Sequence, residues 1–193
     1  MKFTKKYRIG LDILNLEKDK NMSVHVKIGT IDDVLEISFL GKKTFDQSFG
    51  HLFGDRKDLT DYLDHTFSIE KLKSSIVKLH NVYWVAYYGK SAVGYAKIQL
   101  NSSSEFVESS KGCKLQKIYI LKEYLSMGIG AQLNQLIFDK AISNNSEYIW
   151  LSVLKSNEKA VRFYERNLYT IVGEHSFNIG KEDFDFWVMS RKL

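Results

Sequence analysis

The sequence predicts a single mixed-sheet α/β domain, and two observations support that fold class. The stretch from 114 to 153 reads as strand, helix, strand, which predicts one parallel pair with a right-handed crossover. The remaining strands include hairpin-like neighbours, so we expect them to pair in antiparallel fashion. A chain of 193 residues fits one domain, and 44% hydrophobic residues are enough to fill its core.

Local patterns place the individual elements. Alternation predicts a strand at 24–28, and helical faces follow between 31 and 80 with a loop near 50–54. After that loop, Leu59, Tyr62, Leu63 and Phe67 indicate one helix, and Ile69, Leu72 and Ile76 indicate another. A short hairpin turn joins the next two strands, and the Ser-rich stretch 101–112 predicts a loop. The predicted order is β-α-α-β-β-β-α-β-α-β-β, with later strands at 82–88, 92–100, 114–120, 148–153, 169–177 and 184–191 and helices at 129–141 and 156–167.

Charge and composition exclude several classes of protein. The net charge of +5 comes from scattered Lys and Arg, without the basic stripe and interleaved aromatics of a nucleic-acid binder. No apolar run reaches the ~18 residues of a membrane span, and no secretory leader opens the chain. Cys113 is the only cysteine, which fits a reducing compartment. We therefore expect a cytoplasmic protein without nucleic-acid or membrane partners.

The first 21 residues are charged and weakly patterned, unlike the rest of the chain. They predict an N-terminal extension at 1–21, followed by one domain at 22–193. Two explanations stay open for the extension. Translation starts at Met22, or the segment forms a short helix that packs on the domain.

The most informative motif is Leu125-Ser126-Met127-Gly128-Ile129-Gly130, between a strand and a helix. Two glycines let the backbone approach a ligand closely and adopt positive φ. The helix that begins beside them presents unpaired N–H groups and the positive end of its dipole. Together these features predict a cradle for a pyrophosphate.

A second segment strengthens this interpretation. Asn157-Glu158-Lys159-Ala160-Val161-Arg162-Phe163-Tyr164 opens the helix after the next strand. The two motifs, in this order of elements, resemble the GNAT N-acetyltransferases across residues 24–191. The resemblance implies the GNAT fold, which is a mostly antiparallel central sheet with one splayed parallel pair and helices on both faces. It also implies acetyl-CoA as cosubstrate and direct acetyl transfer to a primary amine.

Further segments resemble the PaiA-type polyamine N-acetyltransferases within that family. They are Thr44-Phe45, Tyr62-Leu63, 115–120, Ile149-Trp150-Leu151, Glu174-His175-Ser176-Phe177 and 188–193. The resemblance implies spermidine or spermine as the acceptor. Acetylation of a protein N-terminus, a lysine or another small amine stays open, because acceptor specificity lies in variable loops. A CoA-binding regulator without turnover is an alternative from another class. A nucleic-acid or membrane-surface module that uses the basic N-terminus is a third, and its binding would depend steeply on salt.

The resemblance also implies which residues hold the cofactor. They are Ile118, Tyr119, Ile120, Leu125, Ser126, Met127, Gly128, Ile129, Gly130, Ala131, Asn157, Ala160 and Tyr164. Tyr164 matches the general acid of the family, and a phenol is suited to protonate an alkyl thiolate. Asn157 contacts CoA, caps its helix, or does both.

Tyr119, His175 and Asp46 are the predicted acceptor-binding residues. Each has a simpler interpretation: Tyr119 as a packed aromatic, His175 as a hydrogen-bonded structural residue, and Asp46 as part of a solvated helix face. The scattered histidines lack metal-ligand spacing, so we expect no metal.

Three departures from the family pattern stand out. Leu125 replaces an Arg or Gln, Leu168-Tyr169 replaces Gly-Phe, and Gln116 replaces an acid often found on the third strand. The general base is therefore not identified. The sequence fits either a monomer or a homodimer.

Overall fold

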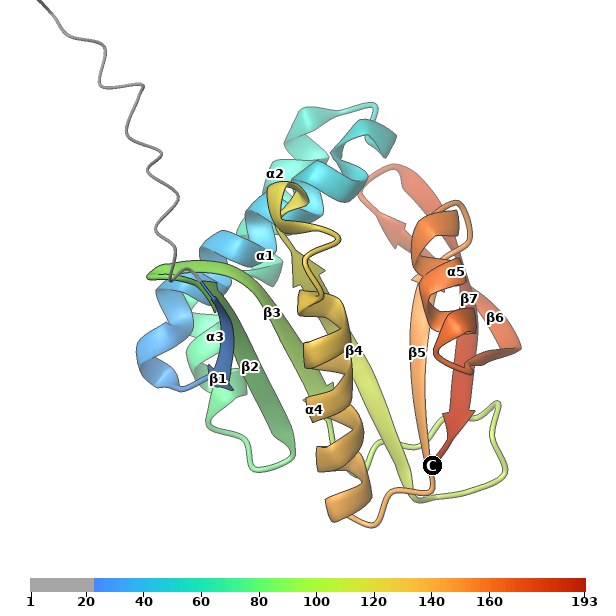
Figure 1. Cartoon of the computed structure of the whole chain (residues 1–193). Coiled ribbons are helices and arrows are strands. Elements are labelled where there is room, and N and C mark those ends of the chain that lie inside the picture. Colours follow the sequence, from blue (N-terminus) through green and yellow to red (C-terminus); the bar gives the residue numbers. More distant parts are fainter. Residues whose placement is uncertain (1–22) are drawn as a thin grey trace, which may run out of the picture.

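The computed structural model describes residues 23–193, so the extension predicted at 1–21 lies outside the described residues. The described residues form seven strands and five α-helices (Figure 1). In order they are β1 (Val24–Ile28), α1 (Val34–Phe49), α2 (Arg56–Thr66), α3 (Ile69–Ile76), β2 (Asn81–Tyr88), β3 (Ser91–Gln99), β4 (Gly112–Ile120), α4 (Ile129–Ser143), β5 (Tyr148–Leu154), α5 (Glu158–Arg166), β6 (Thr170–Ile179) and β7 (Glu182–Lys192).

All seven strands form one sheet in the order β1-β2-β3-β4-β5-β7-β6. The pair β4–β5 is parallel and every other pair is antiparallel, as the sequence predicts. The β4–β5 ladder is short, because it pairs only Gly112, Cys113 and Lys114 with residues 148–150. Beyond Lys114 the two strands diverge, and this splay opens the middle of the sheet.

A β-bulge lies next to the splay. In the β3–β4 ladder, Lys97 is opposite Lys117 while Ile98 is opposite Leu115, so Gln116 is the extra residue on β4. A bulge leaves one residue outside the ladder and re-aims its side chain. The Gln116 side-chain amide donates to Gln99 Oε1 at 2.6 Å.

Helices cover both faces of the sheet, and the central strands are therefore buried on both sides (Figure 1). On β2, Trp84 and Ala86 join the core beneath α4, while Tyr83 and Val85 join the core beneath α1 and α3. Successive strand residues point to opposite faces, so a strand between two helical layers must be apolar throughout. This explains the uninterrupted apolar run in β2.

The helical segment before β2 corrects the predicted element order, which counted two helices. The structure has three α-helices there, because side-chain caps start two new ones after the break near Gly50. Asp55 accepts a hydrogen bond from the Lys57 amide at 2.8 Å, and Ser68 accepts one from the Lys71 amide at 3.3 Å. Such caps satisfy N–H groups that a helix start leaves free.

Candidate active site

A cleft of about 1270 Å³ lies where β4 and β5 diverge. It is lined by β4, the start of α4, β5 and α5, and by residues of α1 and the C-terminal β6–β7 hairpin. Ligand pockets typically have volumes of about 300–1,000 Å³. The cleft is thus large enough for a long cofactor and an acceptor together.

The glycine loop forms one wall of the cleft with an unusual backbone. Ser126 has φ +64° and Gly128 has φ +77°, which is the left-handed region. A Cβ atom on Gly128 would meet nothing within 4 Å, so the backbone conformation rather than packing requires glycine there. No side chain caps the start of α4. Its first-turn N–H groups are therefore available to an anion.

Most of the residues that the sequence assigns to the cofactor lie together on the cleft wall. Met127 and Ile129 are the two that do not line it. Ile129 is 1% exposed and packs in the core beneath α4, because the first apolar position of that helix turns inward. The other members line the cleft, namely Ile118, Tyr119, Ile120, Leu125, Ser126, Gly128, Gly130, Ala131, Asn157, Ala160 and Tyr164.

Asn157 stands at the start of α5 and faces the cleft. Its Oδ1 atom accepts a hydrogen bond from the Ala160 amide at 3.3 Å, so the capping role is present. The cap uses the side-chain oxygen, and the side-chain NH₂ group remains as a donor on the cleft wall. A single residue thus starts the helix and offers a polar contact.

Tyr164 lies on the inward face of α5 and is 8% exposed. Its ring makes edge-to-face contacts with Phe163 and Tyr169, at centroid distances of 5.3 and 5.5 Å. Burial raises the pKa of the Tyr164 phenol above its usual value, so the hydroxyl stays protonated at neutral pH. A protonated hydroxyl on a cleft wall is suited to donate a proton.

The three predicted acceptor-binding residues have different surroundings. Tyr119 lines the cleft and also packs edge-to-face on Tyr95 at 5.8 Å, so the packed aromatic is present and the acceptor-binding role stays a prediction. His175 lines the cleft too, with its ring stacked on Phe186 and its Nε2 atom 2.8 Å from Ser152 Oγ. Asp46 does not line the cleft, because its carboxylate pairs with Arg56 at 2.8 Å on the surface of the helical segment.

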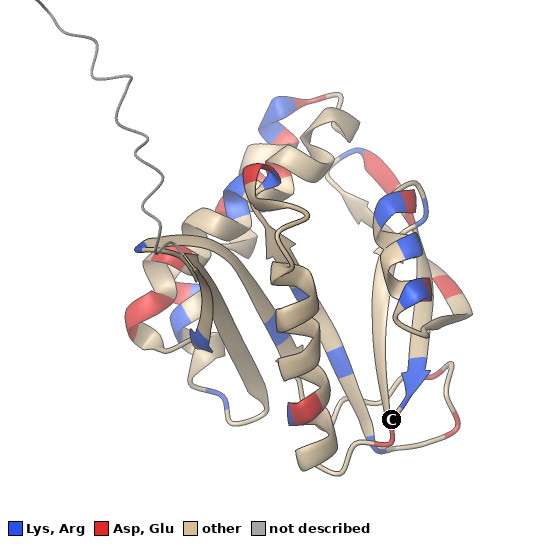
Figure 2. Cartoon of the chain, viewed as in Figure 1, with Lys and Arg blue, Asp and Glu red and all other residues tan. Residues whose placement is uncertain are grey.

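Basic side chains dominate the charged lining of the cleft. In Figure 2 the ribbon is blue at Lys and Arg positions of β4 and α5. Glu158 is the only acid on the described wall, against six Lys and Arg residues: Lys114, Lys117, Lys122, Lys159, Arg162 and Arg166. A cationic wall attracts phosphate groups through its field.

Other chemistry-bearing groups contribute little to the described site. Cys113 is buried in the paired part of β4, outside the cleft, and burial raises the pKa of its thiol to about 12. Within residues 23–193, no group of three or more His, Cys, Asp or Glu side chains converges as a metal site. In the same range, no helix combines the length and apolarity that a membrane span requires.

Two groups of cleft residues escaped the sequence analysis. Aromatic residues come from α1, α2 and the C-terminal hairpin, namely Phe45, Phe49, Tyr62, Phe177, Phe184 and Phe186. The local density of aromatics was a signal, but each pattern also fits ordinary core packing. Lys114 and Lys117 were the second group, and their signal was a charge inside an otherwise apolar strand.

Comparison with known proteins agrees with this geometry. The model of the Acetyltransferase (GNAT) family matches residues 48–168. An uncharacterized N-acetyltransferase encoded in the pepI 3′ region of Lactobacillus delbrueckii subsp. lactis is 25% identical over 161 residues, covering 83% of this chain and 92% of that protein.

Solved structures show the same fold at low identity. PaiA N-acetyltransferase from Thermoplasma acidophilum, in complex with coenzyme A, has a TM-score of 0.69 at 18% identity, covering 89% of this chain and 100% of that one. The ribosomal-protein-S18-alanine N-acetyltransferase from Escherichia coli has a TM-score of 0.64 at 14% identity, covering 88% and 94%.

Fold and cleft together define an acyltransferase that uses a CoA thioester. The chain belongs to the GNAT acetyltransferase family and is an acetyl-CoA-dependent N-acetyltransferase. The seven-stranded sheet with its single parallel pair is the GNAT fold that the sequence predicts.

The left-handed glycine of the loop gives a first testable prediction. We expect Gly128→Ala to raise the Kd for CoA about tenfold, because a side chain in the left-handed region costs roughly 1–2 kcal/mol. The free loop relaxes away from this conformation, and binding must restore it. Titration calorimetry with CoA measures the change.

The matched control is Gly89→Ala, which places the same side chain at φ +58° in the β2–β3 turn, away from the cleft. An equal loss of CoA affinity in both variants would show that the Gly128 effect is not local to the cofactor.

Proposed function

We propose that the cleft between β4 and β5 holds acetyl-CoA and that acetyl transfer to a primary amine takes place there, with Tyr164 as the proton donor. One observation supports this most strongly. The splayed strands, the uncapped start of α4, Asn157 and Tyr164 all border one cleft, although they come from four separate elements. The residues fit the cofactor, since free N–H groups and cationic side chains are what phosphate groups require.

The cofactor supplies an acetyl group activated as a thioester. The described residues then have three tasks. The first turn of α4 and the basic side chains of α5 bind phosphates, and the unpaired edges of β4 and β5 offer backbone groups to the extended arm of the cofactor. Asn157 offers its amide to the same arm. Tyr164 holds the proton that the departing sulfur requires.

The proton balance of this scheme is simple. The acceptor amine loses one proton before it attacks, since an ammonium has no lone pair. That first proton goes to solvent. A carbon–nitrogen bond forms, the carbon–sulfur bond breaks, the nitrogen loses a second proton, and the Tyr164 hydroxyl gives its proton to the sulfur. The second proton from the nitrogen returns to Tyr164 through solvent, so each turnover releases one proton net. Gln116 cannot act as the base, because an amide does not titrate in this range.

A polyamine such as spermidine or spermine is the acceptor to which the sequence resemblance points. Binding a polycation calls for several carboxylates near the amine. The described wall offers Glu158 alone, and Asp46 is engaged with Arg56. The charge of the cleft therefore argues for an acceptor that is not a polycation. Acetylation of an N-terminus or another small amine fits this wall better. A cytoplasmic location and a monomer or homodimer stay predictions from the sequence.

Thiol release from acetyl-CoA tests the proposal. Wild-type protein is mixed with acetyl-CoA and a panel of amines that includes spermidine, a neutral alkylamine, amino acids and a short peptide. We expect release that depends on one class of amine, with one acetylated product formed for each thiol. CoA binding without release for any amine would favour the regulator. No CoA binding would contradict the assignment of the cleft.

A further inference from the structure

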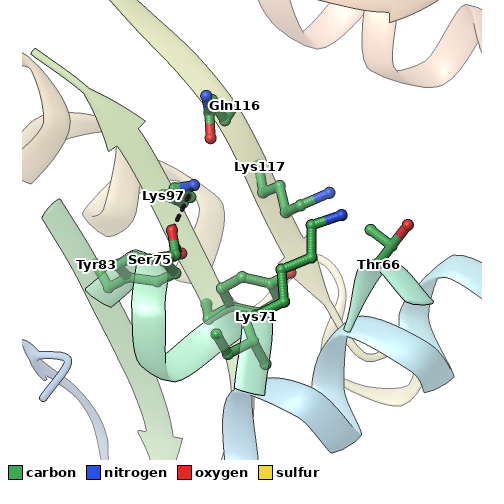
Figure 3. Close-up of a pocket in the computed structure, with 9 residues that line it drawn as sticks. Thr66, Lys71, Ser75, Tyr83, Lys97, Gln116 and Lys117 are labelled. Atoms are coloured by element: carbon green, nitrogen blue, oxygen red, sulfur yellow. Dashed lines mark hydrogen bonds between the residues drawn. The ribbon is translucent and has the colours of Figure 1, made fainter. Parts of the chain in front are cut away.

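Three lysines from three elements converge on a small pocket beside the cleft. Lys71 comes from α3, Lys97 from β3 and Lys117 from β4, and all three line a cavity of about 180 Å³. Figure 3 shows the side chains of Lys71 and Lys117 extending toward the same space, while Lys97 turns to Ser75. The Lys97 Nζ atom lies 3.0 Å from Ser75 Oγ. This arrangement concentrates positive charge on one side of the sheet.

No acid of the described chain balances that charge. None of the ion pairs within residues 23–193 involves Lys71, Lys97 or Lys117, and the pocket wall contains no Asp or Glu. Lys97 and Lys117 are directly opposite each other across the β3–β4 ladder. Like charges in opposite positions of a sheet destabilise it. Aromatic rings lie beside both amino groups, but rings supply no counter-charge.

Burial adds to the cost of these charges. Burial, together with repulsion from the neighbouring lysines, lowers the pKa of both Lys97 and Lys117 to about 8. Both amines are still mostly protonated at pH 7. A bound anion would remove the repulsion and replace the lost solvation.

The pocket also holds one buried hydroxyl that the described residues leave without a partner. The Tyr95 hydroxyl is fully buried, lines the pocket and has no hydrogen-bond partner among the described residues. Such a group costs free energy unless a ligand or water satisfies it. Thr66 and Gln116 add further polar atoms to the wall. The donor set of ammonium and hydroxyl groups suits a carboxylate or a phosphate.

The pocket adjoins the proposed active site, because Gln116 and Lys117 line both cavities. We propose that Lys71, Lys97 and Lys117 bind an anionic group, a carboxylate or a phosphate, on the acceptor amine. The acceptor is then an amine that carries a negative charge, rather than a polycation. This inference rests on the proposed function, and it names the acceptor class for the same site.

Acceptors matched in length but not in charge test the inference. γ-Aminobutyrate, aminobutanol and putrescine differ only in the group at the far end, and aminopropyl phosphate adds the phosphate arm. Longer and shorter homologues of each amine are included, because the acceptor must span the distance from the pocket to the thioester. We expect kcat/KM for the anionic amines to exceed that for the neutral amine by about tenfold or more, with the dication lowest. The better of the two anions identifies the group.

Lys71→Met tests the residues, since Lys71 is exposed on α3 and its replacement does not disturb the core. We expect the ratio of kcat/KM for anionic over neutral acceptors to fall about tenfold in this variant. Lys73→Met is the matched control, because it removes the same charge from the same helix outside the pocket. A ratio that is unchanged in Lys71→Met, or lowered equally in Lys73→Met, would overturn the assignment.

Two further measurements separate this inference from the proposed function. Wild-type enzyme that acetylates neutral and anionic amines equally well would overturn the anion pocket and leave the function intact. If no amine is acetylated, the same amines are titrated into the protein in the presence of CoA, and their affinities are compared. Equal affinities for anionic and neutral amines would overturn the inference. Sulfate that binds without competing with γ-aminobutyrate would place the anion site outside the acceptor site. A Lys71→Met variant with lower affinity for CoA, and an unchanged preference among acceptors, would do the same.

Discussion

Tyr164→Phe is expected to lower kcat by roughly 10²–10⁴ at saturating concentrations of both substrates. The variant removes one hydroxyl from the cleft wall and keeps the ring contacts with Phe163 and Tyr169. Burial raises the pKa of this phenol, and it also raises the proton affinity of a thiolate formed nearby, so proton transfer stays feasible. Affinity for CoA should change little, because the lost group acts on the departing sulfur. Steady-state kinetics and a CoA titration measure the two effects.

Tyr169→Phe is the matched control for this experiment. Tyr169 is buried next to Tyr164, its hydroxyl has no partner among the described residues, and it does not line the cleft. We expect kcat to stay near the wild-type value in this variant. A kcat within about twofold of wild type in Tyr164→Phe would remove Tyr164 from the role of proton donor.

Lys97→Met is expected to stabilise the protein by about 2 kcal/mol at pH 7. The lysine is half-buried, faces Lys117 across the sheet and lies near Lys71 and Lys78, so its charge is costly in the folded state. Methionine fills a similar volume without that charge. Loss of the Lys97 amino group does not leave Ser75 unpaired, because Tyr83 Oη and Asn81 Nδ2 remain 2.8 and 3.0 Å from Ser75 Oγ. Chemical denaturation measures the free energy of unfolding.

The pH dependence gives this prediction a definite sign. Lys97 has a pKa of about 8 in the folded chain and near 10.5 when unfolded, so the unfolded state binds more protons between these values. Wild-type stability due to this group therefore rises with pH across that window. The advantage of Lys97→Met should be complete below pH 8 and vanish toward pH 10.5. The exposed Lys73→Met variant should show neither effect.

A destabilised Lys97→Met variant would mean that the contacts with Ser75 and Tyr83 outweigh the charge repulsion. A stabilised variant would instead show that the chain keeps a costly charge in its sheet. Natural proteins retain such costs mainly where function requires them. Measurements of stability and of acceptor preference thus test the same lysine pocket independently.

Local patterns were enough to predict most of the architecture. Residues 114–153 were predicted as strand, helix, strand with a parallel pair, and they form β4, α4 and β5 with that pairing. The prediction is confirmed because hydrophobic periodicity indicates the type of element and crossovers between parallel strands have a fixed hand. The predicted element order counted two helices before β2 instead of three, although the apolar spacing indicated both α2 and α3. The exact starts of these polar helices depend on the caps at Asp55 and Ser68. Such short side-chain contacts are weak signals in a sequence.

The part of the site that depends on the register between distant strands could not be predicted from the sequence. The residues of the glycine loop and α5 that the sequence assigns to the cofactor form motifs, and most of them line the cleft. The lysine pocket forms no motif, because Lys71, Lys97 and Lys117 meet only through the packing of α3 and the bulge at Gln116. Pairing between distant strands is set by the whole sheet, and one inserted residue changes which side chains face each other.

Backbone amide chemical shifts recorded during a CoA titration test the central claim most directly. We expect the largest changes at Ile118–Ile120, at Leu125–Ala131 and at Asn157–Ala160, the three segments where the cleft offers backbone and cap groups. Changes confined to other parts of the sheet, or no changes at millimolar CoA, would contradict the placement of the cofactor between β4 and β5.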